Sequence, residues 1–364
     1  MRILHVITSL RTGGAEKLMV DLLPKLRDLG NEVEILLFDG IPTPFYDQLI
    51  SAGIQVNALR VGGSVYNPAN ILALRPYLKR FDIIHSHNTA CQFFLAIAKK
   101  ITRASCKIVT TEHSTSNRRR DHSFFKAIDG WMYNQYEKII CVSEISAQNI
   151  RDYVGCSRMP IAVIPNGIDY SKFSEAQPNA EIIDHYAGVR RAVMVAGFRY
   201  EKDHPTVIKA FSLLPDDYHL FLVGDGDRRQ EYEKLIRELG CEDKIHLLGV
   251  RSDVPSLLKA SEVVIMSSHR EGLSLSNLEG MASGRPFVAS DVDGLHEIVD
   301  GYGLLFPHED AQALADIIIK LSADESYAKK VALRCQERAK QFDINVMARR
   351  YNSIYQEVYR LSSV

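Results

Sequence analysis

The sequence lacks any apolar run long enough to cross a membrane and any paired-cysteine motif. A transmembrane helix needs roughly 18 or more consecutive apolar residues, and the 364-residue chain contains no such run. The N-terminal MRILHVITSL has no small-residue cleavage site behind an apolar region, which favours a core strand over a signal peptide. The six cysteines show no CxxC spacing, as expected for reduced thiols that pack rather than cross-link. Together these absences predict a cytoplasmic protein.

Common cofactor and metal motifs are absent as well. The glycine turn TGGAE matches neither the GxGxxG motif of dinucleotide-binding folds nor the Walker A motif. The sequence therefore lacks the usual motifs for NAD binding and for P-loop ATP binding. The sequence has no HExxH motif, and no DxD pair is suitably placed to hold a metal ion. We therefore expect neither a cofactor nor a bound metal.

Charge is nearly balanced overall but unevenly distributed. The formal net charge is −1, yet residues 1–165 carry 20 Lys and Arg against 14 Asp and Glu, and residues 166–364 carry 24 against 31. The excess is greatest within residues 51–138, where 13 basic residues face 5 acidic ones. A basic first half suggests an anionic partner, although a solvated surface with chance bias gives the same count. We expect that partner to be a substrate or a membrane surface and not a nucleic acid.

Strands and helices alternate twice along the chain. The apolar run RILHVITSL is followed by a glycine turn and by an amphipathic helix that ends at Gly30, and the alternation continues to the strand KIICVS. It restarts after VIPNGIDYSKF with RAVMVAGF. Strands that alternate with helices predict parallel sheets covered on both faces. In the first half NILALRPYLKRF is interpreted as one helix.

This alternation predicts two Rossmann-like domains of α/β class, with a boundary near residue 170. We assign residues 1–170 to an N-terminal domain and residues 171–345 to a C-terminal domain. The last amphipathic segment, residues 346–364, is predicted to cross back and pack on the first domain. Because ligands of open parallel sheets bind beyond the carboxyl ends of the strands, two such sheets facing each other would form a cleft that holds the chemistry.

A pair of glutamates defines the candidate donor site. In HREGLSLSNLEGMASGRP, Glu271 and Glu279 lie eight residues apart. The segment is interpreted as a Gly/Ser-rich loop and a helix that starts near Ser276, with Glu279 in its first turn. Free backbone N–H groups would then bind a diphosphate. They belong to Gly272, Leu273, Ser274, Leu275 and Ser276. Each carboxylate suits hydroxyls at one end of that diphosphate: a sugar for Glu271 and a ribose for Glu279.

Other polar residues follow predicted strands. Arg199 and Lys202 come just after RAVMVAGF, where two cations could clamp a phosphate, although a solvated basic loop is the simpler explanation. His85-Ser86-His87 ends another buried strand, with one imidazole expected on each side of the pleat. Glu112 and His113 end the next strand. A structural role is the simpler explanation for any single one of these histidines.

Several of these motifs together resemble a known family. The two-glutamate element, with GGAEK, VIPNGID, LVGDGD, LLGVRSDV and HEIV, is similar to the family 4 retaining glycosyltransferases of GT-B fold, over nearly the whole chain. The resemblance implies that the residues matching Gly14, Arg199, Lys202 and the 272–275 loop surround a diphosphate. It also implies that His87 lies near the transferred sugar, and that Arg251 belongs to a segment bordering the base. By the same resemblance, residues 1–170 form the acceptor-binding domain and residues 171–345 the donor-binding domain.

The sequence departs from the family pattern at two places. The family places an arginine five residues before the lysine, and here Gly197 occupies that position, so Arg199 has to reach in from two residues later. The segment DGYGLLF after HEIV is short, which makes the loop beside the sugar unusual.

The resulting interpretation is a retaining, metal-independent hexosyltransferase. It would move a hexose or N-acetylhexosamine from a nucleotide-diphosphate sugar, with UDP preferred, to a hydroxyl of a saccharide acceptor in bacterial surface polysaccharide synthesis. Lys202, Arg199, Glu271 and His87 are its candidate catalytic residues. The alternatives are a GDP-mannose-dependent mannosyltransferase, a nucleotide-sugar epimerase and a non-catalytic sugar-nucleotide-binding subunit.

A basic and aromatic segment suggests how the acceptor is reached. Arg118, Arg119, Arg120 and Lys126 lie beside Phe124, Phe125 and Trp131, the only tryptophan. Cations next to large rings suit the surface of an anionic bilayer, whereas an ordinary helix with a solvated start would give the same pattern. We expect peripheral binding at the inner face of the cell membrane, with the acceptor on a lipid diphosphate and His113 on the acceptor side.

Overall fold

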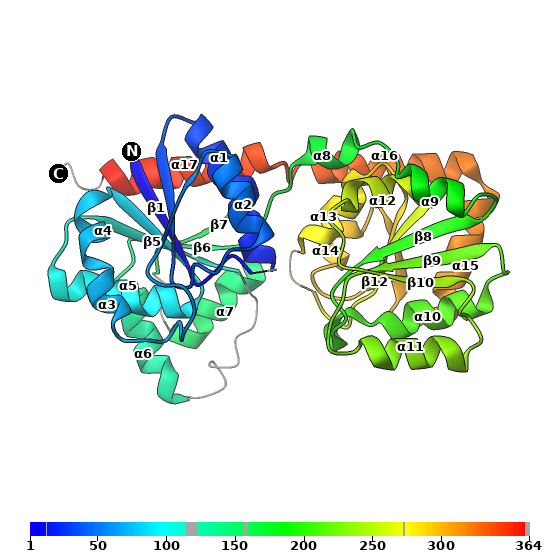
Figure 1. Ribbon diagram of the computed structural model, residues 1–364, viewed down its shortest axis with the longest axis horizontal. Coiled ribbons are helices and arrows are strands. Elements are labelled where there is room, and N and C mark those ends of the chain that lie inside the picture. The colour runs from blue at the N-terminus through cyan, green and yellow to red at the C-terminus, as the bar shows by residue number, and fades with distance from the viewer. Residues whose placement is uncertain (12, 114–122, 156–158, 272–273, 361–364) are drawn as a thin grey trace. The chain divides into compact units, whose positions relative to one another are not determined.

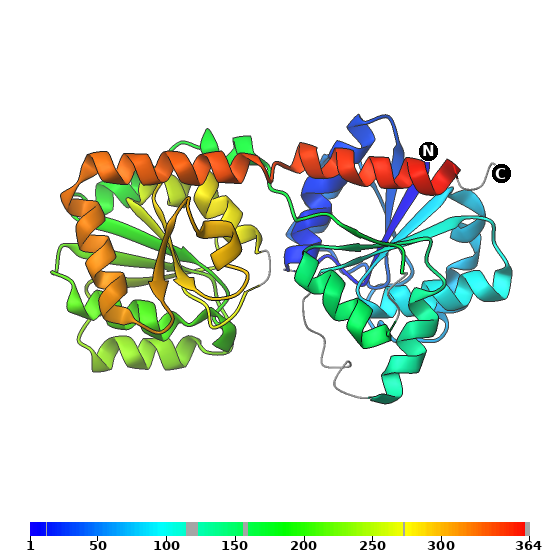
Figure 2. The same ribbon diagram turned by 180° about the vertical axis from the view of Figure 1, so that it is seen from behind.

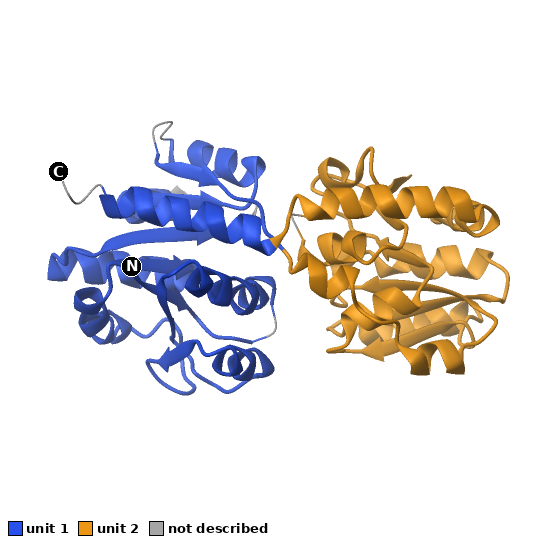
Figure 3. Ribbon diagram, turned by 90° about the horizontal axis from the view of Figure 1, so that it is seen from above, with its two compact units in different colours: residues 1–167, 344–364 blue, residues 168–343 orange. Residues whose placement is uncertain are grey.

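The chain folds into two compact units (Figure 3). A computed structural model describes residues 1–364 except 12, 114–122, 156–158, 272–273 and 361–364. The first unit comprises residues 1–167 and 344–364, and the second comprises residues 168–343. Among the described residues, no helix has the length and apolar character needed to span a bilayer.

The first unit is built on a seven-stranded parallel sheet in the order β3-β2-β1-β4-β5-β6-β7. Figure 1 labels β1, β5, β6 and β7 of this sheet. The strands are β1 (Arg2–Ile7), β2 (Glu32–Leu37), β3 (Gln55–Ala58), β4 (Ile83–His87), β5 (Lys107–Glu112), β6 (Lys138–Cys141) and β7 (Ile161–Val163). The order reverses between β1 and β4, so the crevice where doubly wound sheets bind ligands lies beyond the carboxyl ends of these two strands.

Helices cover both faces of this sheet, and the sheet residues alternate between two apolar cores. Ile3 and Ile7 of β1 belong to one core, and Leu4 and Val6 belong to the other. The helices of this unit are α1 (Gly14–Asp28), α2 (Pro44–Ser51), α3 (Asn70–Ala73), α4 (Arg75–Arg80), α5 (Thr89–Thr102), α6 (Ser123–Tyr133), α7 (Glu144–Val154) and α17 (Ile344–Arg360).

Helix α17 completes the first core from the far end of the sequence. It packs beside α1 and lies along the first unit in Figure 2. Its apolar face buries Met347, Tyr351, Tyr355 and Val358 against the core that contains Ile3. Burial of a large side chain stabilises a fold by about 1.5–3 kcal/mol, so this helix is an integral part of the unit.

The second unit has a six-stranded parallel sheet in the order β10-β9-β8-β11-β12-β13. Its strands are β8 (Arg190–Val195), β9 (Tyr218–Val223), β10 (Ile245–Gly249), β11 (Val263–Met266), β12 (Phe287–Asp291) and β13 (Leu304–Pro307). Its helices are α8 (Tyr170–Ser174), α9 (Ala180–His185), the 3-10 turn η2 (Tyr200–Lys202), α10 (His204–Leu213), α11 (Arg229–Glu238), α12 (Val254–Ala260), α13 (Leu275–Ala282), α14 (His296–Val299), α15 (Ala311–Ala323) and α16 (Glu325–Lys340). The order reverses between β8 and β11.

Two sequence predictions about helices are wrong in detail. The segment 70–81 forms α3 and α4 rather than one helix. Pro76 at the start of α4 has no N–H to continue the hydrogen-bond ladder, so the helix is interrupted at Leu74. Helix α13 begins at Leu275, one residue from the predicted start near Ser276, after the extended residue Ser274, but the predicted place of Glu279 in its first turn is wrong. Glu279 is therefore the fifth residue of the helix and lies in its second turn.

Candidate active site

The second unit brings Lys202 and Glu271 together at the carboxyl edge of its sheet. Lys202 ends η2, which follows β8, and Glu271 lies in the loop after β11. These strands are neighbours at the point where the strand order reverses. The two loops are joined by a backbone hydrogen bond from His269 to the carbonyl of Glu201, at 3.0 Å.

Lys202 and Glu271 form an ion pair between Nζ and Oε2. The two side chains are 20% and 13% exposed, so the pair is largely withdrawn from water. Ser268 donates its hydroxyl to the same Oε2 at 3.2 Å. Ser268 is itself held by Ser290, whose Oγ accepts from the Ser268 N–H at 2.9 Å and donates to the Ser268 carbonyl at 3.0 Å. The carboxylate of Glu271 thus has a fixed position beside a cation.

Arg199 lies directly over the glycine that replaces the expected arginine. The residue is exposed and precedes η2 in extended conformation. A Cβ placed on Gly197 would lie 3.8 Å from Nε of Arg199. The Arg199 side chain therefore passes over the space that a side chain at Gly197 would enter.

Glu279 is a buried residue of α13, the helix that follows the predicted diphosphate loop in sequence. Gly272 and Leu273 lie outside the described residues. The described part of the loop contains Ser274, and Leu275 opens the helix. As the first residues of a helix, Leu275 and its successors have backbone N–H groups without intrahelical partners, which is the arrangement expected at an anion site.

Arg251 follows β10 and forms a two-pronged ion pair with Asp253. Its Nε and Nη2 atoms each donate to one carboxylate oxygen at 2.8 Å. This pairing lowers the pKa of Asp253 and raises the pKa of Arg251. Strand β10 is at the edge of the sheet, so Arg251 lies three strands from β11.

In the first unit, Gly14 opens helix α1 after the glycine turn. No described atom would lie within 4 Å of a Cβ added at Gly14. Gly13 precedes it, and the carboxylate of Glu16 folds back over Gly13 so that a side chain there would collide with it. The start of α1 at Gly14 is therefore open in the part of the chain that the structure describes.

The prediction that His85 and His87 point to opposite sides of the sheet is wrong. Residues two apart in a strand share a face, and the two rings stack with centroids 4.4 Å apart. His5 of β1 is in register with His85 and joins them on this face. All three imidazoles are fully buried. Burial lowers the pKa of His5 to about 3 and lowers the pKa values of His85 and His87 well below the usual range, so the three rings are neutral at physiological pH.

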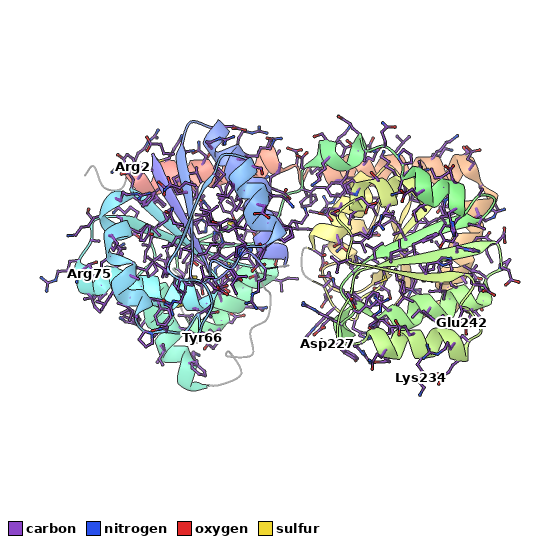
Figure 4. The ribbon with its side chains drawn as sticks, viewed as in Figure 1. Arg2, Tyr66, Arg75, Asp227, Lys234 and Glu242 are labelled. Carbon is purple, nitrogen blue, oxygen red and sulfur yellow. The ribbon has the colours of Figure 1, made fainter. Side chains whose placement is uncertain are left out.

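A pocket of about 370 Å³ adjoins these histidines. It is lined by Thr8, Val65, Tyr66, Asn88, Thr89, Ala90, Gln92, Thr111, Glu112 and His113. Tyr66, labelled in Figure 4, is an exposed part of this lining. Asn88 has a φ of 68°, unusual for a residue other than glycine, and its Oδ1 accepts hydrogen bonds from the Thr8 N–H and hydroxyl. Backbone strain of this kind is concentrated at functional sites.

The predicted membrane segment is described only in part. Arg118, Arg119 and Arg120 lie outside the described residues, as does the side chain of Phe124. Within α6, Trp131 is 38% exposed and Lys126 is exposed. Met132 is buried in the core, so Trp131 lies on the helix surface while its neighbour anchors the helix.

Two groups of described residues bring three potential metal ligands within 4.8 Å of one another. They are His5, His85 and His87 in the first unit and Asp203, His269 and His308 in the second. In the first group the ring nitrogens are hydrogen-bonded to protein groups, which a metal ion would have to displace. In the second, Asp203 already caps α10 and accepts from Ser267 at 2.9 Å. Independence from a metal stays a prediction.

Sequence reasoning missed the residues that hold the pair in place. Ser267 and Ser268 directly follow β11, and their hydroxyls donate to the carboxylates of Asp203 and Glu271, respectively. Asp203 takes a left-handed conformation with φ of 30°. The sequence contained a signal for these residues, because two serines follow the apolar run EVVIM directly before HREG.

Two parallel sheets of Rossmann type with polar residues at their carboxyl edges define a protein of GT-B architecture, and solved structures share it. The chain aligns with the Anabaena protein HepE in complex with UDP at a TM-score of 0.82 and 22% identity, covering 98% of this chain and 100% of that one. It aligns with a glycosyltransferase from Rickettsia africae at a TM-score of 0.83 and 23% identity, covering 98% of each chain.

The family follows from the sequence matches. The family model described as Glycosyltransferase Family 4 matches residues 12–172, and that described as Glycosyl transferases group 1 matches residues 177–342. The chain belongs to these glycosyltransferases, as the motifs predicted.

Curated relatives align over most of their length. A UDP-Gal:alpha-D-GlcNAc-diphosphoundecaprenol alpha-1,3-galactosyltransferase of Escherichia coli is 23% identical, with 89% of both chains covered. A phosphatidyl-myo-inositol mannosyltransferase of Mycolicibacterium smegmatis is 27% identical, with 95% of this chain and 90% of the relative covered. An N,N'-diacetylbacillosaminyl-diphospho-undecaprenol alpha-1,3-N-acetylgalactosaminyltransferase of Campylobacter jejuni is 25% identical, with 93% and 94% covered.

Proposed function

We infer that this glycosyltransferase moves a hexose or N-acetylhexosamine from a UDP-sugar to a hydroxyl of a saccharide carried on a lipid diphosphate, with retention of configuration. The observation that carries the proposal is the Lys202–Glu271 pair at the reversal point of the second sheet, at the opposite end of a short loop from the start of α13. A cation and free helix N–H groups suit a diphosphate, and a fixed carboxylate suits sugar hydroxyls.

The proposed chemistry is electrostatic. As the glycosidic bond breaks, negative charge grows on the departing diphosphate, and Lys202, Arg199 and the N–H groups of α13 stabilise it. The leaving phosphate takes the proton of the attacking hydroxyl on the same face of the sugar, which accounts for retention without an enzyme nucleophile. Glu271 holds the sugar hydroxyls, and Glu279 holds the ribose. His87 is fully buried and its Nδ1 lies 2.9 Å from Nε2 of His113, so it supports the wall of the first unit's pocket.

The choice of donor rests on the relatives. One is named for UDP-galactose, and HepE was solved with UDP and with UDP-glucose. Relatives named as mannosyltransferases keep GDP-mannose as the alternative donor. Melting curves with UDP-, GDP- and ADP-sugars distinguish these donors, because a ligand at 100 times its Kd stabilises the folded state by about 2.7 kcal/mol.

A transfer assay tests the activity itself. Incubation of the favoured donor with mixed saccharide-diphosphate lipids should yield a glycosylated lipid. Epimerised donor without transfer would instead identify an epimerase. Donor binding without any turnover would identify a non-catalytic subunit.

The lipid-linked acceptor is supported by two relatives whose names contain diphosphoundecaprenol. Exposed Trp131 and Lys126 on α6 are consistent with contact to an anionic membrane surface. Flotation with anionic and with neutral liposomes at low salt tests this contact. Anionic vesicles should carry the protein upward and salt should release it, whereas failure to bind either kind would refute membrane association.

A further inference from the structure

The buried His5, His85 and His87 and the half-buried His113 form one continuous hydrogen-bonded chain with two tyrosines of α17. Starting at the pocket, Nε2 of His113 lies 2.9 Å from Nδ1 of His87, and Nε2 of His87 lies 3.0 Å from Nδ1 of His5. The hydroxyl of Tyr355 lies 3.4 Å from Nε2 of His5 and 2.6 Å from Nδ1 of His85.

The chain continues from His85 to the second tyrosine. Nε2 of His85 lies 2.8 Å from Oγ1 of Thr111, which lies 3.1 Å from the hydroxyl of Tyr351. Both tyrosine side chains are fully buried. The chain thus runs from the core beneath α17 to the wall of the pocket, where His113 is its last member.

Neutral imidazoles impose a direction on such a chain. Each neutral ring carries one N–H and one lone pair, and burial favours the neutral form by lowering the pKa of His113 to about 4 and that of His5 to about 3. Tyr355 has a single hydroxyl proton, so it donates to either His5 or His85 and accepts from the other. The bonds must therefore run head to tail, and all four histidines must share one tautomer.

The hydrogen bond of Tyr351 at the buried end of this series determines the donor-to-acceptor direction. If the bonds ran from the pocket inward, the buried hydroxyl of Tyr351 would be left with no acceptor among the described residues, which is costly. If they run outward, Tyr351 donates to Thr111, every buried donor is used, and the remaining N–H lies on His113 at the pocket, where water or a ligand accepts it.

We propose that this chain fixes His5, His85, His87 and His113 as Nδ1–H tautomers, so that Tyr351 and Tyr355 act as positioning residues that make His113 a hydrogen-bond donor to the ligand of the pocket. Because its outward nitrogen carries a proton, His113 binds the ligand and does not act as a general base. In the same pocket wall, Oε1 of Glu112 already accepts hydrogen bonds from Nε2 of Gln92 at 2.6 Å and from the hydroxyl of Tyr133 at 2.9 Å. A neutral donor in a pocket lined by hydroxyl and amide side chains suits saccharide hydroxyls; this last assignment rests on the proposed function.

Nuclear magnetic resonance of the full chain tests the tautomers without any activity assay. A deuterated sample labelled with 15N and 13C, assigned through the side chains, should show all four imidazoles at pH 7.5 with a pyrrole-type shift at Nδ1 and a pyridine-type shift at Nε2. A single Nε2–H tautomer or an imidazolium among the four would overturn the proposal.

Substitution of Tyr355 tests the positioning role. Tyr355→Phe keeps the ring and removes the one donor to Nε2 of His5 found among the described residues, so the His113 shifts should move toward a mixture of tautomers. Tyr359→Phe, at a half-exposed site on α17, should leave those shifts unchanged. If the His113 chemical shifts stay unchanged in a folded Tyr355→Phe protein, the positioning role of Tyr355 is refuted. If the transferase activity is confirmed, Tyr355→Phe should also raise the KM for acceptor at unchanged kcat. A tautomer shift without measurable transfer would contradict only the proposed function.

Discussion

Lys202 and Glu271 form an ion pair across two loops that come from neighbouring strands of the second sheet. Partial burial makes each charge dependent on the other, since an isolated buried charge is costly. A diphosphate arriving at the start of α13 would offer Lys202 a second anionic partner without removing the first. The pair therefore holds the lysine in place before any substrate is bound.

Lys202→Ala should reduce turnover by roughly 100-fold or more, because one lost charge contact to a transition state costs on that order. Steady-state kinetics measures the loss. Lys209→Ala is the matched control, because Lys209 is an exposed lysine on the adjoining α10. Near-normal turnover in Lys202→Ala would contradict the phosphate-clamp assignment.

Arg199→Ala should lower kcat, and adding Gly197→Arg should restore it. An added Cβ at Gly197 would lie 3.8 Å from Nε of Arg199 and from the carbonyl of Asp225, so the first carbon of an arginine at this position causes no collision. Restored kcat in the double variant would establish that a guanidinium from residue 197 or from residue 199 can contact the same diphosphate site. Loss in the single variant without rescue in the double variant would indicate that Arg199 acts elsewhere.

Glu279→Ala should chiefly weaken donor binding. The proposed ribose contact is the same in the ground state and the transition state, so KM should rise roughly 10- to 100-fold while kcat stays close to normal. Titration calorimetry with the nucleotide diphosphate alone measures the same loss. Glu279→Gln, which keeps the size and one acceptor oxygen, should lose less. A reduced kcat at constant KM would assign Glu279 a catalytic role instead.

The first unit should lose stability as the pH falls below about 6.5. Unfolded histidines titrate near 6.5, whereas the pKa values of His5 and His113 are lowered to about 3 and about 4 by burial. Between these values the unfolded chain binds more protons, so stability is complete above 6.5 and is lost on acidification. Each such histidine contributes a slope of about 1.4 kcal/mol per pH unit.

Urea unfolding at pH 7.5, 6.5 and 5.5, followed by a probe in the first unit, measures this slope. His113→Gln should flatten the dependence, whereas His308→Gln, at an exposed position in the second unit, should not. Equal stability at the three pH values would contradict the neutral, buried assignment.

The sequence predicted the strands that lie in the centre of each sheet. Central strands of a parallel sheet are buried on both faces, so they appear as continuous apolar runs. The strands that sequence reasoning did not identify are β3, β7 and β13, each at a sheet edge. Their residues are mainly half-buried, and without a continuous apolar run they resemble loops.

The sequence predicted those site residues that belong to short contiguous motifs. Glu271, Glu279 and Lys202 belong to linear motifs, and the reversal point between β8 and β11 follows from the alternation of strands and helices. The histidine chain was not predictable, because it depends on the register of β1 against β4 and on tyrosines more than 230 residues away in sequence from Thr111 and His85.

The position of α17 has a consequence for synthesis of the protein. The second unit is continuous in sequence, whereas the core of the first unit stays open on one side until residues 344–360 have been made. Domains of nascent chains usually fold in order from the N-terminus. Here the domain that emerges first from the ribosome is completed last, so its exposed apolar face must be protected while the whole of the second domain is translated.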